Sequence, residues 1–123
     1  MTVWNDTQPI FIQIRQRIID LILAGDGNTQ EALPSVRAIS SELSVNPLTV
    51  TKSYQSLVEL GVIEKRRGLG MFLTENARTK LLKHEREKFL RDEWPRIHAQ
   101  IKGLNLSVSD LIEKQEESKS NAK

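Results

Sequence analysis

The pattern of hydrophobic positions predicts an amphipathic helix over residues 10–24. Isoleucine recurs at every fourth position of this segment, and that spacing places the apolar side chains on one face of a helix. Pro9 suits the first turn, and Gly25 ends the helix. The polar segment 26–31 is then expected to form a loop. The opposite, polar face of the helix carries Gln13, Arg15, Gln16 and Arg17.

Two more helices with a tight turn between them are expected in residues 34–60. In Pro34–Leu43, Ser35 is a candidate N-cap, and the turn lies at residues 44–46. Pro47–Leu60 opens with a proline at a favourable first position, after a possible cap by Asn46, and Gly61 closes it. The apolar stripes of the two helices are Val36, Ile39 and Leu43, then Val50, Tyr54 and Leu57. The outward positions of the second helix are Leu48, Thr49, Thr51, Lys52 and Gln55.

A β-hairpin is predicted directly after these helices. Val62–Lys65 and Met71–Thr74 are short β-like runs, and between them lies the sequence Arg-Arg-Gly-Leu-Gly. Basic residues followed by a Gly-x-Gly tip are typical of a hairpin connection. A phosphate-binding loop is not supported at Gly68–Gly70, because no helix that starts with Lys-Ser or Lys-Thr follows.

From Glu75 onward the chain is highly charged and helical in pattern. Apolar residues keep three- and four-residue spacing through residues 76–102, while Pro95 is expected to kink or restart the helix, and Gly103 is a candidate C-cap. Ser107 and Asp110 match a capping box that starts a last short helix. Residues 116–123 hold no large apolar side chain, so the last six to eight residues are expected to be disordered.

These elements together predict a mainly α fold with one small β-hairpin. Residues 1–74 are expected to form a winged helix-turn-helix domain, and residues 75–123 a short α-helical tail. In such a domain the second helix of the pair enters the major groove of DNA, and its N-terminal residues contact base edges. The hairpin is placed to bring Arg66 and Arg67 to phosphates or to a minor groove.

Composition narrows the function classes. The chain of 123 residues has no cysteine, and no apolar run approaches the ~20 residues that span a bilayer. Residues 1–9 lack the features of a secretory signal, so a soluble cytoplasmic protein is expected, with no membrane partner. Residues 1–74 hold 7 Lys+Arg and 7 Asp+Glu, which makes this half neutral. DNA binding must therefore depend on where the basic residues lie and not on their number.

Residues 9–74 resemble the GntR family of bacterial regulators. The similarity is carried by PIFIQIRQRI, LPSVRAISSEL and VNPLTVTKSYQSLVELGVIEKRRGLGMFL. It implies DNA contacts from Arg37, from the start of the recognition helix and from the Arg67–Gly68 pair of the wing. Many relatives carry arginine where Pro47 or Thr51 stands, so threonine hydroxyls, Asn46 and contacts of Leu48 with thymine methyl groups are expected here instead. The candidate DNA-contacting residues are Ser35, Arg37, Asn46, Pro47, Leu48, Thr49, Thr51, Lys52, Arg66, Arg67, Gly68 and Gly70.

The tail resembles that of the YtrA-like subfamily, whose short C-terminal helices pair two copies. Residues 75–123 are too few for the effector or aminotransferase-like domain of other family members. An amphipathic stripe of this kind is buried either in a two-fold dimer, which is favoured, or by folding back onto the winged domain. The candidate dimerisation residues are Leu82, Phe89, Leu90, Trp94, Ile97, Ile101, Leu111 and Ile112.

The expected function is that of a dimeric, sequence-specific transcriptional repressor. It would bind an inverted-repeat operator in double-stranded DNA and be nucleoid-associated when bound; the alternative is a protein-interaction module that uses the winged fold as a scaffold. No nucleophile–base pair suggests an enzyme, and His84 and His98 lack the neighbours of a metal site. No cofactor is expected. A small-molecule effector stays open, with Trp94 and Pro95 as a candidate location.

Overall fold

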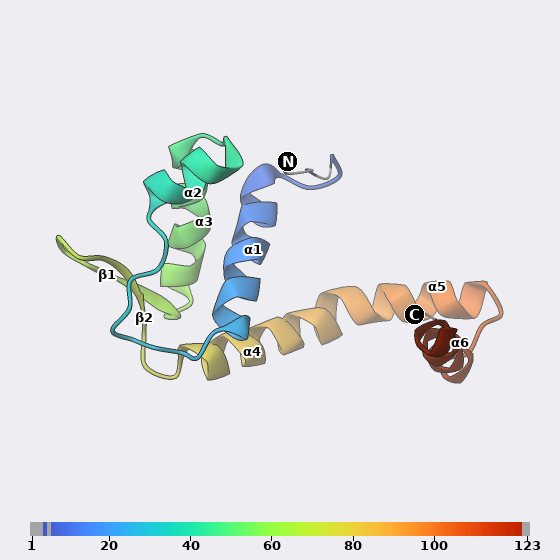
Figure 1. Ribbon diagram of the computed structural model, residues 1–123. Coiled ribbons are helices and arrows are strands. Elements are labelled where there is room, and N and C mark those ends of the chain that lie inside the picture. Colours follow the sequence, from blue (N-terminus) through green and yellow to red (C-terminus); the bar gives the residue numbers. More distant parts are fainter. Residues whose placement is uncertain (1–3, 5, 122–123) are drawn as a thin grey trace. The chain divides into compact units, whose positions relative to one another are not determined.

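The computed structural model describes residue 4 and residues 6–121, with side chains as far as residue 119 (Figure 1). Its elements are α1 (Ile10–Ala24), α2 (Val36–Leu43), α3 (Pro47–Glu59), β1 (Ile63–Arg66), β2 (Gly70–Leu73), α4 (Ala77–Lys88), the π-helix η1 (Phe89–Glu93), α5 (Trp94–Gly103) and α6 (Val108–Asn121). The predicted mainly α fold with one antiparallel hairpin is confirmed. The chain divides into two compact units, residues 1–84 and 85–123, and each is described by itself.

Helix α1 has the predicted bounds, but one residue of its predicted polar face is buried. The N–H of Gly25 closes the helix by donating to the carbonyl oxygens of Leu21 (3.1 Å) and Ile22 (3.3 Å). Arg15 was expected on the solvent side, yet it is only 9 % exposed. Its Nε donates to Ser56 Oγ of α3 at 3.0 Å, because α3 packs against this side of α1.

Helices α2 and α3 begin at the predicted caps. Ser35 Oγ accepts from the backbone N–H of Ala38 at 3.0 Å, and Asn46 Oδ1 accepts from that of Leu48 at 2.9 Å. Between the helices, Ser44 adopts a left-handed conformation with φ of 54°. The turn is closed by Ser40, whose hydroxyl donates to the carbonyl oxygen of Val45. The helix-turn-helix therefore forms where the sequence predicted it.

The core of the first unit is built from the apolar stripes of α1, α2 and α3 together with the inner face of the hairpin. Figure 1 shows α1 beside α3, with the hairpin extending away from the helices. All three residues of the predicted stripe of α3 are buried. The buried apolar residues that pack together in this core are Ile14, Ile18, Ile19, Ile22, Ile39, Val50, Tyr54, Leu57, Val62, Ile63, Leu73, Ala77 and Leu81.

Tyr54 combines a packed ring with one hydrogen bond at its tip. Its hydroxyl donates to the carbonyl oxygen of Pro34, which ties α3 to the start of α2. Burial raises the pKa of Tyr54 from 10.0 to about 12, because a buried phenolate would lose its hydration.

The raised pKa of Tyr54 predicts a loss of stability at alkaline pH. A group whose pKa is higher in the folded chain stabilises it fully below about pH 10, and this contribution is lost as the pH rises towards 12. Tyr54 is the single tyrosine of the chain, so the ultraviolet absorbance of tyrosinate reports on it alone. We expect a midpoint near pH 12 in the native protein and near pH 10 in concentrated urea. Equal midpoints would show that the ring is not buried.

The hairpin is shifted by one residue relative to the predicted strands. Its register pairs Ile63 with Leu73 and Arg66 with Gly70, and residues 67–69 form the connection. Gly68 and Gly70 have φ of 75° and 112°, conformations that side chains other than glycine rarely adopt. The glycines thus close the connection that the Gly-x-Gly sequence predicted.

The first unit extends past the predicted boundary at Thr74. Ala77 and Leu81 of α4 are buried in its core. Arg78 Nη2 donates to the carbonyl oxygen of Leu23 at 2.9 Å, and Lys80 Nζ to that of Gly61 at 3.3 Å. Both cations thus bind carbonyl groups at or just past the C-terminal ends of α1 and α3, where helix carbonyls lack intrahelical partners.

In the second unit, the predicted interruption at Pro95 takes the form of a π turn. Proline has no N–H to donate to the carbonyl four residues earlier, so the regular α-helical pattern cannot continue through it. Residues 89–93 widen into η1, and the N–H of Trp94 donates to the carbonyl oxygen of Phe89. Helix α5 restarts with Pro95 in its first turn.

The ends of α5 and α6 differ from the prediction. Gly103 is not the C-cap: Asn105 takes the left-handed position, with φ of 59°. The N–H groups of Asn105 and Leu106 reach the carbonyl oxygens of Lys102 (3.0 Å) and Ile101 (3.1 Å), a Schellman motif.

The capping box is confirmed by reciprocal bonds between Ser107 and Asp110, of 3.1 and 3.3 Å. Helix α6 continues to Asn121, past residue 116 where disorder was expected, and residues 122–123 lie outside the described chain. Residues 113–119 consist of glutamate, lysine, glutamine and serine, mostly strong helix formers, which explains the added length.

Candidate nucleic-acid interface

The outward face of α3 presents the side chains that the sequence assigned to base contacts. Leu48 is 75 % exposed, although an apolar side chain of this size is usually at least partly covered. Thr51 is exposed as well, and its hydroxyl donates to the carbonyl oxygen of Pro47 at 3.0 Å. Thr49 is half-buried, at the edge of this face. Because Val50 and Tyr54 anchor the opposite face in the core, the outward face is held in one orientation.

Ser35 and Asn46 act as helix caps and still retain donors. Each side-chain oxygen accepts a backbone N–H from its own helix, at 3.0 Å for Ser35 and 2.9 Å for Asn46. In the described part of the chain, the hydroxyl proton of Ser35 and the amide N–H groups of Asn46 have no acceptor. Both caps can therefore donate to phosphate or base oxygens without releasing their helices.

Lys52 lies on the α1 side of the recognition helix. Its Nζ stands 4.0 Å from the centroid of the Phe11 ring, a cation–π contact that holds the side chain near the start of α1. The ammonium group stays exposed there and can reach a phosphate at the flank of the helix.

The two faces of the hairpin separate the basic residues of the wing. Arg66 belongs to the outer face, where its guanidinium carbon lies 4.2 Å from the centroid of Phe72 and its Nε 3.7 Å from Glu64 Oε2. Lys65 is paired with Met71 on the other face, the one that buries Ile63. Arg66 therefore does not lie on the face of the hairpin that is turned toward the recognition helix. Lys65 lies on that face.

Lys65 was not among the candidate residues predicted from the sequence. The two-residue period of a strand, counted from the apolar Ile63, would have placed Lys65 on the inner face of the wing. Arg67 lies at the exposed connection, next to Gly68, as the motif implied.

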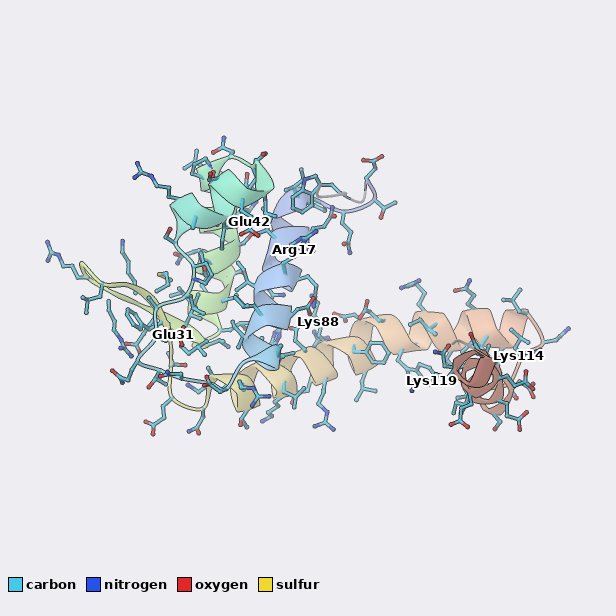
Figure 2. All side chains as sticks on the ribbon, viewed as in Figure 1. Arg17, Glu31, Glu42, Lys88, Lys114 and Lys119 are labelled. Carbon is cyan, nitrogen blue, oxygen red and sulfur yellow. The ribbon has the colours of Figure 1, made fainter. Side chains whose placement is uncertain are left out.

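The basic residues of the first unit differ in whether an acidic side chain pairs with them. Among the described residues, Arg37, Lys65 and Arg67 form no ion pair, whereas Arg66 is partnered by Glu64. Figure 2 shows the acidic side chain of Glu31 in the loop between α1 and α2, and that of Glu42 on α2. A neutral total charge thus still leaves three unpaired cations near α2 and the wing.

The candidate dimerisation residues are divided between the two units. Leu82 is exposed and belongs to the first unit, and the others belong to the second. Of those, Phe89, Leu90, Leu111 and Ile112 are exposed, while Trp94, Ile97 and Ile101 are half-buried. Three further exposed apolar residues, which were not among the candidates, lie around the start of α6, namely Leu104, Leu106 and Val108. Trp94 stacks in a tilted arrangement on His98, with ring centroids 5.4 Å apart.

Neither a metal-binding cluster nor a membrane-spanning helix is found in the described residues, which are residue 4 and residues 6–121. No group of three or more His, Cys, Asp or Glu side chains there is placed to hold a metal ion. None of the helices in that part of the chain has the length and apolar character needed to cross a bilayer.

Residues 12–73 match the family described as bacterial regulatory proteins, gntR family. This range runs from the first turn of α1 to the end of β2. The chain belongs to the GntR family. The match covers the helix-turn-helix and the hairpin, the elements that carry the interface described above.

Relatives of the GntR chain extend the comparison. It is 40 % identical over 78 residues to the HTH-type transcriptional repressor YtrA of Bacillus subtilis, covering 63 % of this chain and 60 % of that one. It is 29 % identical over 110 residues to the uncharacterized HTH-type transcriptional regulator YhcF of the same organism, covering 89 % of both. A GntR family regulator from Listeria monocytogenes superposes with a TM-score of 0.74 at 25 % identity, over 93 % of this chain and 98 % of that one.

These relatives place the chain in the YtrA-like part of the GntR family. It is a DNA-binding transcriptional regulator, not an enzyme.

Proposed function

We propose that the GntR chain is a sequence-specific repressor that binds an inverted-repeat operator as a homodimer. One observation supports this most strongly: an exposed, capped N-terminal half of α3 lies in the same unit as unpaired cations on α2 and the wing. A helix presented in this way fits the major groove, and the cations fit the phosphates that flank it.

Base recognition is proposed to rest on α3 and Arg37. Leu48 would contact a thymine methyl group, since its side chain is apolar and exposed. Thr49 and Thr51 would supply hydroxyls at the edge of the same face, and Arg37 would approach a guanine or a phosphate from α2. Contacts of the wing would come from Arg67 and the backbone at Gly68, with Lys65 facing the gap between wing and α3.

Pairing of two copies is proposed for the helices of the second unit. Exposed apolar side chains on α6 and its approach would be covered by the same residues of a second copy, an arrangement that places two recognition helices on one duplex. A repressing outcome is supported by the YtrA relative, which is named a repressor. We place the protein in the cytoplasm, bound to the nucleoid, with a small molecule as a candidate regulator.

Selection of bound DNA from a random pool tests this proposal. The full chain should enrich two inverted half-sites whose centres lie about 10 base pairs, or a multiple, apart. Recovery of a single half-site would contradict the dimer, and a pool without enrichment would contradict sequence specificity.

Arg37 and Arg66 should differ in their contribution to DNA affinity. Arg37→Ala should cost about 1–3 kcal/mol of binding free energy if the guanidinium contacts a base. Arg66→Ala removes the same charge, but from a side chain already held by Glu64 and Phe72, so we expect a smaller cost. Fluorescence anisotropy on the selected operator measures both. A larger loss for Arg66→Ala would contradict the assignment of the two hairpin faces.

A further inference from the structure

A crevice of about 450 Å³ lies between α2, α3 and the inner face of the hairpin. Its apolar walls include Val36 of α2, Val58 of α3 and Met71 of β2, with Leu69 from the hairpin connection. The backbone N–H of Leu33 donates to the carbonyl oxygen of Met71 at 2.8 Å. That bond ties the loop before α2 to the wing, so both sides of the crevice belong to one hydrogen-bonded framework.

The chemistry of the crevice is selective for one kind of ligand. Among the residues that line it, all within the described part of the chain, Lys65 alone carries a charge, and no acidic side chain pairs with it. Ser35 and Gln55 add neutral polar groups, while the hydroxyl of Tyr54 is already committed to Pro34. Apolar walls with one cation favour an apolar body that carries one negative charge.

We propose that this crevice binds a small amphipathic anion, an aromatic or branched aliphatic group with a single carboxylate. The cavity volume lies in the range of about 300–1,000 Å³ typical of small-molecule sites. The carboxylate would lie at Lys65, and the apolar body would contact Val36, Val58 and Met71. This location differs from the candidate effector location that the sequence suggested near Trp94.

Occupation of the crevice should weaken DNA binding, and this consequence rests on the proposed function. Ser35, Thr51 and Gly70 line the crevice and are also candidate DNA contacts. A carboxylate at Lys65 would neutralise a cation that faces the gap between α3 and the wing, where the DNA backbone must pass. The ligand would therefore act as an inducer that releases the operator.

The binding step can be tested without DNA, on the full chain, with 1-naphthoate as the probe and 1-naphthalenemethanol as its uncharged counterpart. We expect amide chemical-shift changes clustered at residues 33–36, 58 and 65–71, with a dissociation constant on the order of 1 mM for a ligand of this size. The alcohol should bind about 3- to 10-fold more weakly, because it lacks the charge that pairs with Lys65.

Two variants separate the charge from the apolar walls. Lys65→Met should lower the affinity for 1-naphthoate to that for the alcohol, while the matched control Arg67→Met, outside the crevice, should change neither. Val58→Phe fills the apolar wall and should abolish binding of both probes, with its melting temperature showing that the domain stays folded.

Shift changes confined to other residues, or equal affinity of acid and alcohol in the unmodified chain, would overturn the site. If the chain binds 1-naphthoate in the crevice but does not bind DNA, the proposed function is overturned and the small-molecule site stands. If 1-naphthoate does not bind while Lys65→Met weakens operator binding, Lys65 is a phosphate contact and the small-molecule site is refuted.

Discussion

Replacement of Leu57 by alanine is expected to lower the free energy of unfolding by about 2–5 kcal/mol. The side chain is fully buried in the core of the first unit, on the face of α3 turned away from the outward residues. The carbonyl of the same residue accepts the N–H of Val62 at 3.2 Å, which connects α3 to the start of the hairpin. The total free energy of unfolding of a native domain is about 5–15 kcal/mol, so the loss is a large share of its stability. Urea denaturation followed by circular dichroism measures it.

Leu48→Ala is the matched control for Leu57→Ala. It makes the same chemical change on the same helix at a residue that is 75 % exposed, so the expected cost is below about 0.5 kcal/mol. At a temperature where both variants are folded, Leu48→Ala should bind DNA more weakly than Leu57→Ala, since Leu48 is the candidate base contact. Similar costs of unfolding for both would mean that the proposed orientation of α3 is wrong.

The second large effect is expected from Ile112→Asp in α6. Ile112 is exposed in the isolated chain, and in the proposed dimer its side chain is covered by the second copy. A carboxylate buried there without a partner is costly, so the variant should sediment as a monomer. Because linked half-site binding gains an effective concentration in the millimolar range, affinity for the two-half-site operator should fall at least about 100-fold. Affinity for one half-site should stay the same.

Ser109→Asp provides the control for this variant. It adds the same charge to the same helix, in the first turn, where an acidic residue is favourable for the helix dipole. We expect a dimer with unchanged operator affinity. A dimeric Ile112→Asp protein would contradict pairing through α6.

The helix-turn-helix could be predicted closely because each of its ends is set by local chemistry. Ser35 and Asn46 cap the helices that follow them, Pro47 takes a first helical position, and Gly61 has the positive φ of a helix end. Such signals act within a few residues, so a single sequence contains them in full.

Features that depend on tertiary neighbours could not be predicted in the same way. Arg15 is polar and lies on the polar side of its helix, and only the packing of α3 reveals that it is buried against Ser56. The one-residue shift of the strands makes Arg66 the last residue of β1, where the sequence had placed it in the connection. At the end of α5, Asn105 and not Gly103 takes the left-handed position, and the N–H of Leu106 donates to the carbonyl oxygen of Ile101, two residues before Gly103.

The candidate site was predicted in its residue types and less well in its geometry. Arg37, Leu48 and Arg67 are exposed, as base or phosphate contacts require. Lys65, which was not among the candidates, lies on the face of the hairpin turned toward the recognition helix, and Arg66 lies on the opposite face, because side chains alternate along a strand. Family resemblance identified the wing, but not the face of the wing on which each side chain lies.

The most direct test of the central claim is fluorescence anisotropy of the full chain with the selected operator and with a scrambled duplex of equal length and composition, at physiological salt. The account predicts that the operator binds at least about 1,000-fold more tightly, and that the affinity falls steeply with salt because phosphates supply much of it. Equal affinity for the two duplexes would contradict it.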